Sequence, residues 1–315
     1  MQRKWRRDWE RSKSQKQAGP VSQRNPFARL VNSILPSVAA AGILLSSVSG
    51  VYANPANGQI TTGAGSITEN GSTMTINQTS DKLGINWQSF NIGSWETVQF
   101  IQPNSNSVAL NRVLGNDASG IYGSLLANGK VFLINPNGIL FAPGAQVNVG
   151  GIVASSLNIS DSDFQAGNYK FTKDAQAGSV VNQGTISATD YAVLLGPQVR
   201  NEGIISARVS ALAAGNAVNL DFDGDNLLNI TVDTAAAGGL AANSGRILAD
   251  GGLVIMSAGT RDALLDTVVN NSGIIQAQSV SSINGVIRLE ADNVTVGGTL
   301  DASGQSAGKT GGMVK

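Results

Sequence analysis

A seven-residue pattern, Asn-x-Gly-x-Ile-x-Ala with small variations, recurs in the second half of the chain and constrains its fold more than any other feature. The four full copies occupy residues 182–188, 201–207, 243–249 and 271–277, and residues 298–302 hold a shorter copy. Successive glycines of the full copies are 19, 42 and 28 residues apart. We interpret the spacing as a period of about 20 residues with insertions and one skipped or diverged copy, which is typical of a solenoid.

Each copy predicts a turn followed by a short strand. Asn-x-Gly suits the turn because Gly or Asn can take a positive φ, and the alternating Ile, Leu or Val side chains of the strand point inward. One such unit cannot bury its apolar face alone, whereas stacked units form a continuous aliphatic core. The predicted fold is therefore all-β, a right-handed parallel β-helix. A β-sandwich is the alternative, but it gives no reason for the recurrence.

An open solenoid end exposes unpaired strand edges, so the residues before the repeats are expected to form an N-terminal cap. Residues 54 to about 100 carry the large apolar side chains that suit this role. They are Ile60, Ile67, Met74, Ile76, Ile85, Trp87, Phe90, Trp95, Val98 and Phe100.

A hairpin outside the solenoid is predicted from residues 218–222 and 227–232, which flank an Asp-Gly turn. Asp221, Asp223 and Asp225 also have the spacing that begins a calcium loop, so calcium binding stays open as a second interpretation. Against it, Asn226 replaces the loop glycine and Val232 stands where a bidentate Glu is needed.

Composition excludes most familiar active sites, because the 315 residues include no His and no Cys. Serine-hydrolase triads, haem imidazole ligands, zinc thiolates and thiol nucleophiles all need one of these residues. We therefore expect no catalytic residue, no cofactor and no bound metal, with calcium at the Asp221 loop as the one alternative left open. With 13% charged residues the chain also has no extended basic surface for nucleic acid.

The first 53 residues have the layout of a secretory signal peptide, although they exceed the usual length. Nine of the first 29 residues are basic and two are acidic, and the longest apolar run that follows is residues 38–45. That run is too short to span a membrane, and it leads to the small residues before Ala53. We expect cleavage between Ala53 and Asn54, which leaves a mature chain with a net charge of −7.

Three stretches of the mature chain are distinctive: Ser-Val-Ala-Leu-Asn-Arg-Val at 107–113, Gly-Lys-Val-Phe-Leu-Ile-Asn-Pro-Asn-Gly-Ile-Leu-Phe at 129–141, and Gly-Gly-Ile-Val-Ala-Ser-Ser at 150–156. They strongly resemble the two-partner secretion domain of filamentous haemagglutinin-type exoproteins. The Phe-Asp-Gly-Asp stretch at 222–225 and the long basic leader resemble the same group. The resemblance covers roughly residues 54–300.

The resemblance implies an export function. In that family the module directs an exoprotein through an outer-membrane β-barrel, whose periplasmic POTRA domains receive it. By this likeness, residues 1–53 form the extended signal peptide, 54–300 the secretion domain, and 301–315 the Gly/Ser-rich start of a missing or truncated stem. The residues expected to carry the secretion signal are Asn111, Arg112, Asn135, Pro136, Asn137, Gly138 and Ile139.

From the residues alone, 135–138 predict a β-turn in which Pro136 sets φ at the second position.

The resemblance also predicts the route of the protein. We expect it to pass through the periplasm to the surface of a Gram-negative bacterium or to the medium, as a monomer. Once outside, the cap and first coils are expected to fold and to template later coils.

Two other functions stay open. One is a β-helical adhesin that binds host cells or carbohydrate directly, for which no receptor site is recognisable. The other is a polysaccharide-active enzyme, whose only candidate residues are Asp250, Arg261, Asp262, Asp266 and Arg288. Their spacing forms no repeated face. The sequence does not distinguish an adhesin, a haem-scavenging protein or a toxin-delivery stem as the complete product.

Overall fold

The computed structural model describes residues 54–222, 228–258, 268–280, 283–306 and 310–315. The predicted signal peptide, including Ala53, lies outside the described residues. Among the described residues, no helix is long and apolar enough to cross a membrane.

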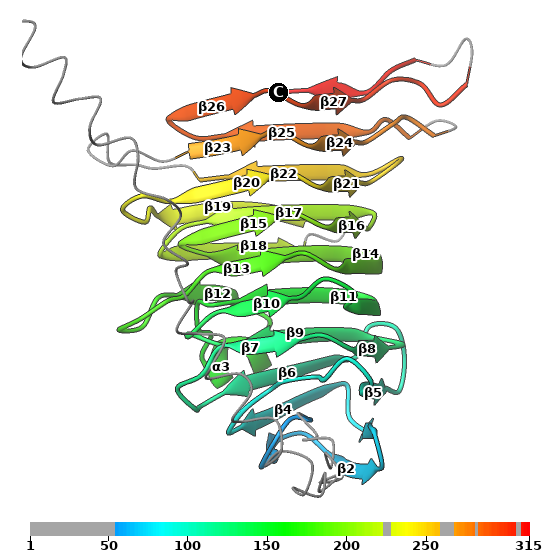
Figure 1. Cartoon of the computed structure of the whole chain (residues 1–315), viewed down its shortest axis with the longest axis vertical. Helices are drawn as coiled ribbons and strands as arrows, with labels where there is room; N and C mark the ends of the chain where they lie inside the picture. Colours follow the sequence, from blue (N-terminus) through cyan, green and yellow to red (C-terminus); the bar gives the residue numbers. More distant parts are fainter. Residues whose placement is uncertain (1–53, 223–227, 259–267, 281–282, 307–309) are drawn as a thin grey trace, which may run out of the picture. The chain divides into compact units, whose positions relative to one another are not determined.

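Strands stack along one axis in three parallel columns, one on each side of the coil (Figure 1). Stack 1 contains β3 (Thr73–Gln78), β5 (Thr97–Ile101), β8 (Ser124–Ala127), the first parts of β11 (Gln146–Ser155) and β14 (Thr185–Gly196), β16 (Ile204–Ser206), β21 (Arg246–Leu248), β24 (Ile274–Gln276) and β27 (Thr299–Asp301). Stack 2 contains β4 (Lys82–Trp87), β6 (Val108–Val113), β9 (Lys130–Ile134), the second parts of β11 and β14, β17 (Val209–Ala214), β22 (Leu253–Ser257), β25 (Val286–Glu290) and β28 (Met313–Val314).

Stack 3 contains β7 (Ser119–Ile121), β10 (Ile139–Phe141), β13 (Val180–Asn182), β15 (Gln198–Asn201), β20 (Leu240–Asn243), β23 (Val268–Asn271) and β26 (Asn293–Val296). Every neighbouring pair within the three stacks is parallel. The predicted parallel β-helix is thereby confirmed, and a sandwich of antiparallel sheets is ruled out.

The N-terminal end is closed by antiparallel strands. β1 (Gln59–Thr62) pairs with β4, and β2 (Gly65–Asn70) forms a hairpin with β3. Trp87 and Phe90 are buried beneath them, with ring centroids 5.6 Å apart. Trp95 was expected in this cap, but that prediction is wrong, because its side chain is 90% exposed on the turn that precedes β5.

The repeated asparagines form a buried ladder inside the solenoid. Asn182 Nδ2 donates to Asn201 Oδ1 over 2.8 Å, Asn201 Nδ2 to Asn243 Oδ1 over 2.8 Å, and Asn243 Nδ2 to Asn271 Oδ1 over 2.7 Å. Each asparagine ends a strand of stack 3 and is at most 1% exposed. The pattern therefore contains one internal hydrogen-bonding position for each coil.

The repeated glycines do not have the positive φ that the sequence predicts; the described residues with positive φ lie elsewhere. The repeated positions need glycine because successive coils stack closely there. A Cβ on Gly203 would meet the carbonyl oxygen of Gly184, and one on Gly245 would meet that of Gly203. Only glycine lets successive coils approach this closely at the corner.

The prediction of a skipped or diverged copy is also wrong. β16 pairs directly with β21, so the 42-residue step is a single coil. The extra residues form a hairpin of β18 (Ala217–Phe222) and β19 (Leu228–Thr234), which confirms the predicted hairpin outside the solenoid.

Two hydrophobic clusters divide the core. The first fills the coil interior, and the second lies between the outer face of stack 2 and a cover made of α3 (Asp161–Ala166), β12 (Tyr169–Thr172), β18 and β19. Alternate residues of one strand supply the two clusters, as Val131 and Phe132 do in β9. Strands covered on both faces account for the continuous apolar runs in the sequence.

Candidate functional site

Asn111 points into the solenoid from β6. It is fully buried, its Oδ1 accepts a hydrogen bond of 3.0 Å from Trp87 Nε1, and its Nδ2 donates to the carbonyl oxygens of Ala109 (3.3 Å) and Phe132 (3.4 Å). Asn111 thus links three successive coils, since Trp87 belongs to β4 and Phe132 to β9. A buried amide needs such partners, because leaving it unpaired costs about 1–3 kcal/mol.

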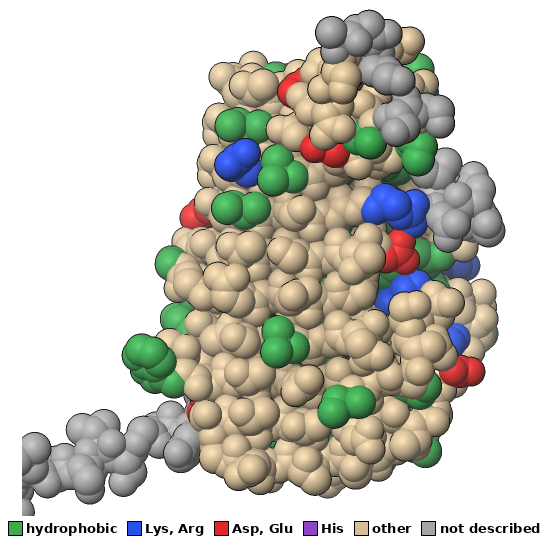
Figure 2. All heavy atoms as spheres, turned by 90° about the vertical axis from the view of Figure 1, so that its right-hand side faces the viewer, with side chains coloured by type: hydrophobic (Ala, Val, Ile, Leu, Met, Phe, Trp, Pro, Cys, Tyr) green, Lys and Arg blue, Asp and Glu red, His purple; other side chains and the backbone are tan. Residues whose placement is uncertain are grey.

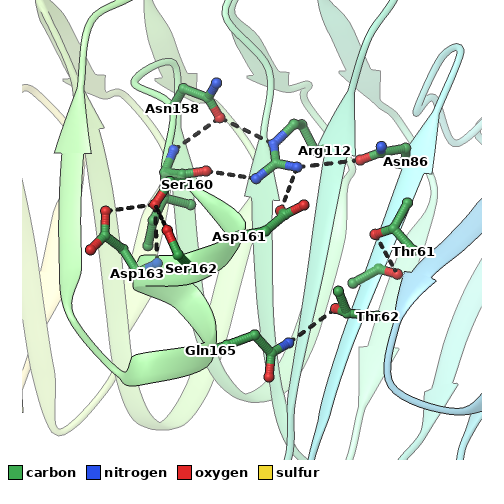
Figure 3. A network of polar contacts seen from close by, with 12 residues as sticks. Thr61, Thr62, Asn86, Arg112, Asn158, Ser160, Asp161, Ser162, Asp163 and Gln165 are labelled. Atoms are coloured by element: carbon green, nitrogen blue, oxygen red, sulfur yellow. Dashed lines mark hydrogen bonds and ion pairs between the residues drawn. The ribbon is translucent and has the colours of Figure 1, made fainter.

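Arg112, the next residue, points outward and is held by the segment that leads into α3 (Figure 3). Its guanidinium donates from Nε to Asn158 Oδ1 (3.1 Å) and from a terminal nitrogen to the Ile159 carbonyl (2.6 Å). The other terminal nitrogen forms an ion pair with Asp161 Oδ1 at 2.8 Å and contacts Asn86 Oδ1 at 3.4 Å. With 12% of its side chain exposed, Arg112 is part of the folded architecture.

Residues 135–138 form the predicted β-turn. The Gly138 N–H donates to the Asn135 carbonyl over 2.9 Å, and Gly138 has a φ of 110°. Asn135 is fully buried, and its Nδ2 donates to the Asp117 carbonyl (3.0 Å) and to Ser119 Oγ (2.9 Å). These contacts join the turn to the loop and strand one coil earlier.

The rest of the turn is held on both sides. Asn137 Nδ2 donates to the Gly115 carbonyl over 2.8 Å, and the Pro136 carbonyl accepts from Gly178 N–H, also over 2.8 Å. Ile139, which is 2% exposed, begins β10. Coils before and after the turn are therefore bonded to it.

The structure brings the two predicted motifs into adjacent coils. Asn111 lies opposite Leu133 and Arg112 opposite Ile134 in the β6–β9 register, and the turn follows Ile134 directly. Both motifs therefore approach the corner between stacks 2 and 3. We call Asn111, Arg112 and residues 135–139 together the corner site.

Sequence reasoning missed the helix that lies beside the corner site. Ser160 caps α3 by accepting from Asp163 N–H over 3.0 Å, and Gly167 ends it with a left-handed φ of 80°. A Ser-x-x-Asp start followed by a terminal Gly is a recognised helix signal. The helix has only six residues, however, and is too short to show a clear apolar period.

Lys82 is the second residue that the sequence did not single out. From β4, its Nζ donates to the carbonyls of Phe164 (2.8 Å) and Gln165 (2.9 Å) in the last turn of α3. The same atom lies 5.5 Å from the Phe164 ring centroid and 5.8 Å from that of Tyr169. Desolvation by these neighbours lowers the pKa of Lys82.

The remaining candidates do not form a site in the part of the chain that the structure describes. Asp221 is exposed on β18, and Asp223 and Asp225 lie outside the described residues. No group of three metal-ligating side chains occurs within the described ranges.

The two enzyme candidates that the structure describes, Asp250 and Arg288, do not contact each other. Asp250 accepts from Gln276 Nε2, whereas Arg288 pairs with Glu290 at 2.9 Å. Arg261, Asp262 and Asp266 lie outside the described residues. Of this set the structure therefore describes only Asp250 and Arg288, and these two residues have different partners.

The parallel β-helix, its outer cover and the corner site hydrogen-bonded to neighbouring coils agree with the two-partner secretion domain that the motifs predict. The sequence profile of the TPS (two-partner secretion) domain family matches residues 52–309. The chain therefore belongs to the family of TPS secretion domains. This is a family of secretion domains of exoproteins, not of enzymes, and it implies export from Gram-negative bacteria with the help of a partner outer-membrane transporter.

The chain is similar to two proteins named heme/hemopexin-binding protein from Haemophilus influenzae. One is 38% identical over 280 residues, with 84% of this chain and 31% of the relative covered; the other is 35% identical over 256 residues, with 74% and 27% covered. The chain thus spans about three tenths of the length of these relatives. Among solved structures, the HMW1 secretion domain from Haemophilus influenzae matches with 33% identity and a TM-score of 0.68, covering 77% of this chain and 66% of that one.

Proposed function

We propose that residues 54–300 are the address by which a larger exoprotein is exported, and that the periplasmic POTRA domains of its transporter bind the corner site before the chain folds. Membership of the TPS secretion domain family carries the export function. In the same proposal, residues 1–53 are a signal peptide removed between Ala53 and Asn54, and residues 301–315 begin a stem.

Burial supports recognition before folding. Asn111 and Asn135 are fully buried, and Arg112 has its hydrogen-bonding groups occupied by neighbouring segments. A partner can reach these side chains only while the chain is extended. An extended apolar chain can also add as a strand to an exposed sheet edge, a common mode of peptide recognition.

The composition of the chain suits export through the periplasm. A chain without Cys cannot form a disulfide that would block threading, and the net charge of −7 after Ala53 favours solubility in transit. Outside the cell, folding of the domain then starts the β-helix of the exoprotein.

Variants that separate recognition from stability test this proposal. Arg112→Ala and Asn137→Pro are expected to abolish secretion in a host that expresses the transporter. The control is Asn271→Leu, which weakens the buried ladder several coils away from the corner site. If secretion of all three variants follows only their measured stability, the corner site is structural and the recognition proposal is wrong.

The names of the relatives favour a second proposal for the complete exoprotein, namely that it binds haem or hemopexin rather than a host-cell carbohydrate. Retention of the secreted exoprotein on haem-agarose and on immobilised hemopexin tests this directly. Retention on neither resin, together with binding to host cells, would favour the adhesin instead.

A further inference from the structure

The outer face of stack 2 is apolar and needs a cover. Leu110, Phe132, Ile134, Val153 and Val193 all point outward from it, yet each is at most 1% exposed. By contrast, on the side of the molecule shown in Figure 2, hydrophobic side chains are scattered singly over a mostly uncharged surface. A continuous apolar sheet face of this kind would be a liability if left open to water.

The cover for this face comes from later in the chain. Residues 157–172 leave the solenoid after β11, and β18 and β19 leave it after β17; β12 of the first excursion pairs with β18 of the second. The first coils are therefore incomplete when their own residues have formed strands. Their outer face stays open until residues more than 40 positions further along have arrived.

The first excursion reaches back to the beginning of the solenoid (Figure 3). Gln165 Nε2 donates to Thr62 Oγ1 over 3.0 Å, across 103 residues of sequence, and Lys82 reaches α3 across 82 and 83 residues. Arg112 adds the bonds to residues 158, 159 and 161. Residues on three neighbouring strands, β1, β4 and β6, therefore hold α3 and the segment before it in place.

Lys82 is the residue best placed to hold the excursion. Carbonyl groups at the end of a helix have no partner within it, and the Lys82 ammonium satisfies two of them in α3. The same charge lies near two aromatic rings of the excursion, Phe164 and Tyr169. Its contacts are specific to the closed arrangement, since they join elements that are far apart in the sequence.

We propose that residues 157–172 are a latch, whose closure over β4, β6 and β9 completes the folding of the N-terminal coils and conceals Arg112. In a simple solenoid each coil depends only on its neighbours. Here the first coils depend on a segment that arrives later, so folding of this region is cooperative over long range. The concealment of Arg112 rests on the proposed function: a transporter that holds Arg112 loses it when the latch closes.

Hydrogen exchange of the purified mature chain, residues 54–315, monitored by mass spectrometry, tests the latch without any transporter. Lys82→Met keeps an apolar chain of similar length but removes both charged hydrogen bonds. We expect amide exchange in α3, β4 and β6 to accelerate by about tenfold or more, with little change in β24. Lys82→Arg, which keeps charge and donors, should restore most of the protection.

Lys170→Met is the matched control. It removes the same charge from an exposed position on β12 and should leave exchange in α3, β4 and β6 as in the wild type. Faster amide exchange in α3 alone in Lys82→Met, with β4 and β6 still protected, would show that residues 157–172 pack onto a solenoid that is already stable without them. That result overturns the latch.

Pulse-chase secretion tests the concealment of Arg112 separately. Lys82→Met should engage the transporter normally but leave it several-fold more slowly than wild type, whereas Arg112→Ala should fail to engage. Normal engagement and secretion of Arg112→Ala, with the exchange result intact, would refute the proposed recognition and leave the folding latch standing. Wild-type release kinetics for Lys82→Met would refute the coupling between latch closure and release.

Discussion

Replacement of Asn201 by Leu probes the buried ladder at its centre. Asn201 accepts from Asn182 and donates to Asn243, both over 2.8 Å, so the substitution removes two ladder bonds. Each is worth about 0.5–1.5 kcal/mol, and each amide group left unpaired costs about 1–3 kcal/mol. We therefore expect Asn201→Leu to lower the free energy of unfolding by roughly 2–5 kcal/mol, since some donors keep weaker carbonyl partners.

Urea unfolding followed by far-UV circular dichroism measures this loss. Asn229→Leu is the control, because Asn229 is exposed on β19, and it should change stability by less than about 0.5 kcal/mol. The double variant Asn201→Leu/Asn243→Leu should lose less than the sum of the single losses, because the two residues share one bond. Equal, small effects of Asn201→Leu and Asn229→Leu would refute the claim that the ladder stabilises the coil.

Three further predictions concern glycine stacking, alkaline pH and the tryptophans. Gly298→Ala should cost about 1–3 kcal/mol, because its Cβ would meet the glycine carbonyl one coil below, whereas Gly297→Ala, which has open space, should be neutral in the same urea titration. Burial, followed by the influence of neighbouring charges, raises the pKa of Tyr191 well above 10.0, so the unfolded chain loses this proton first. The free energy of unfolding should therefore fall above pH 10, by about 1.4 kcal/mol per pH unit. Between pH 9 and pH 11 it should fall less for Tyr191→Phe than for the wild type. Trp95→Ala should leave the thermal midpoint nearly unchanged because Trp95 is exposed, whereas Trp87→Ala should lower it by many degrees because Trp87 is buried.

The solenoid was predictable because its signal is local and repeated. Each Asn-x-Gly-x-Ile-x-Ala copy carries its own turn and inward-pointing strand, so four copies establish the architecture without any long-range information. The spacing alone could not show where an insertion occurs. The 42-residue step fits either a missing coil or a hairpin, and only the pairing of β16 with β21 distinguishes them.

The roles of single residues were less predictable, because they depend on partners distant in the sequence. The pattern identified Asn201 and Gly203 as turn residues, but the ladder and the close stacking appear only when coils are superposed. Arg112 was identified from its motif, whereas its partners in residues 158–161 were not. Lys82 has no motif at all, since its function depends on a six-residue helix more than 70 positions away.

The most direct test of the central claim is secretion of residues 1–315 in a Gram-negative host, with and without the partner transporter. The account predicts release into the medium only when the transporter is present, and a secreted chain that begins at Asn54. Release without the transporter, or a stably folded product that stays in the periplasm when the transporter is present, would contradict it.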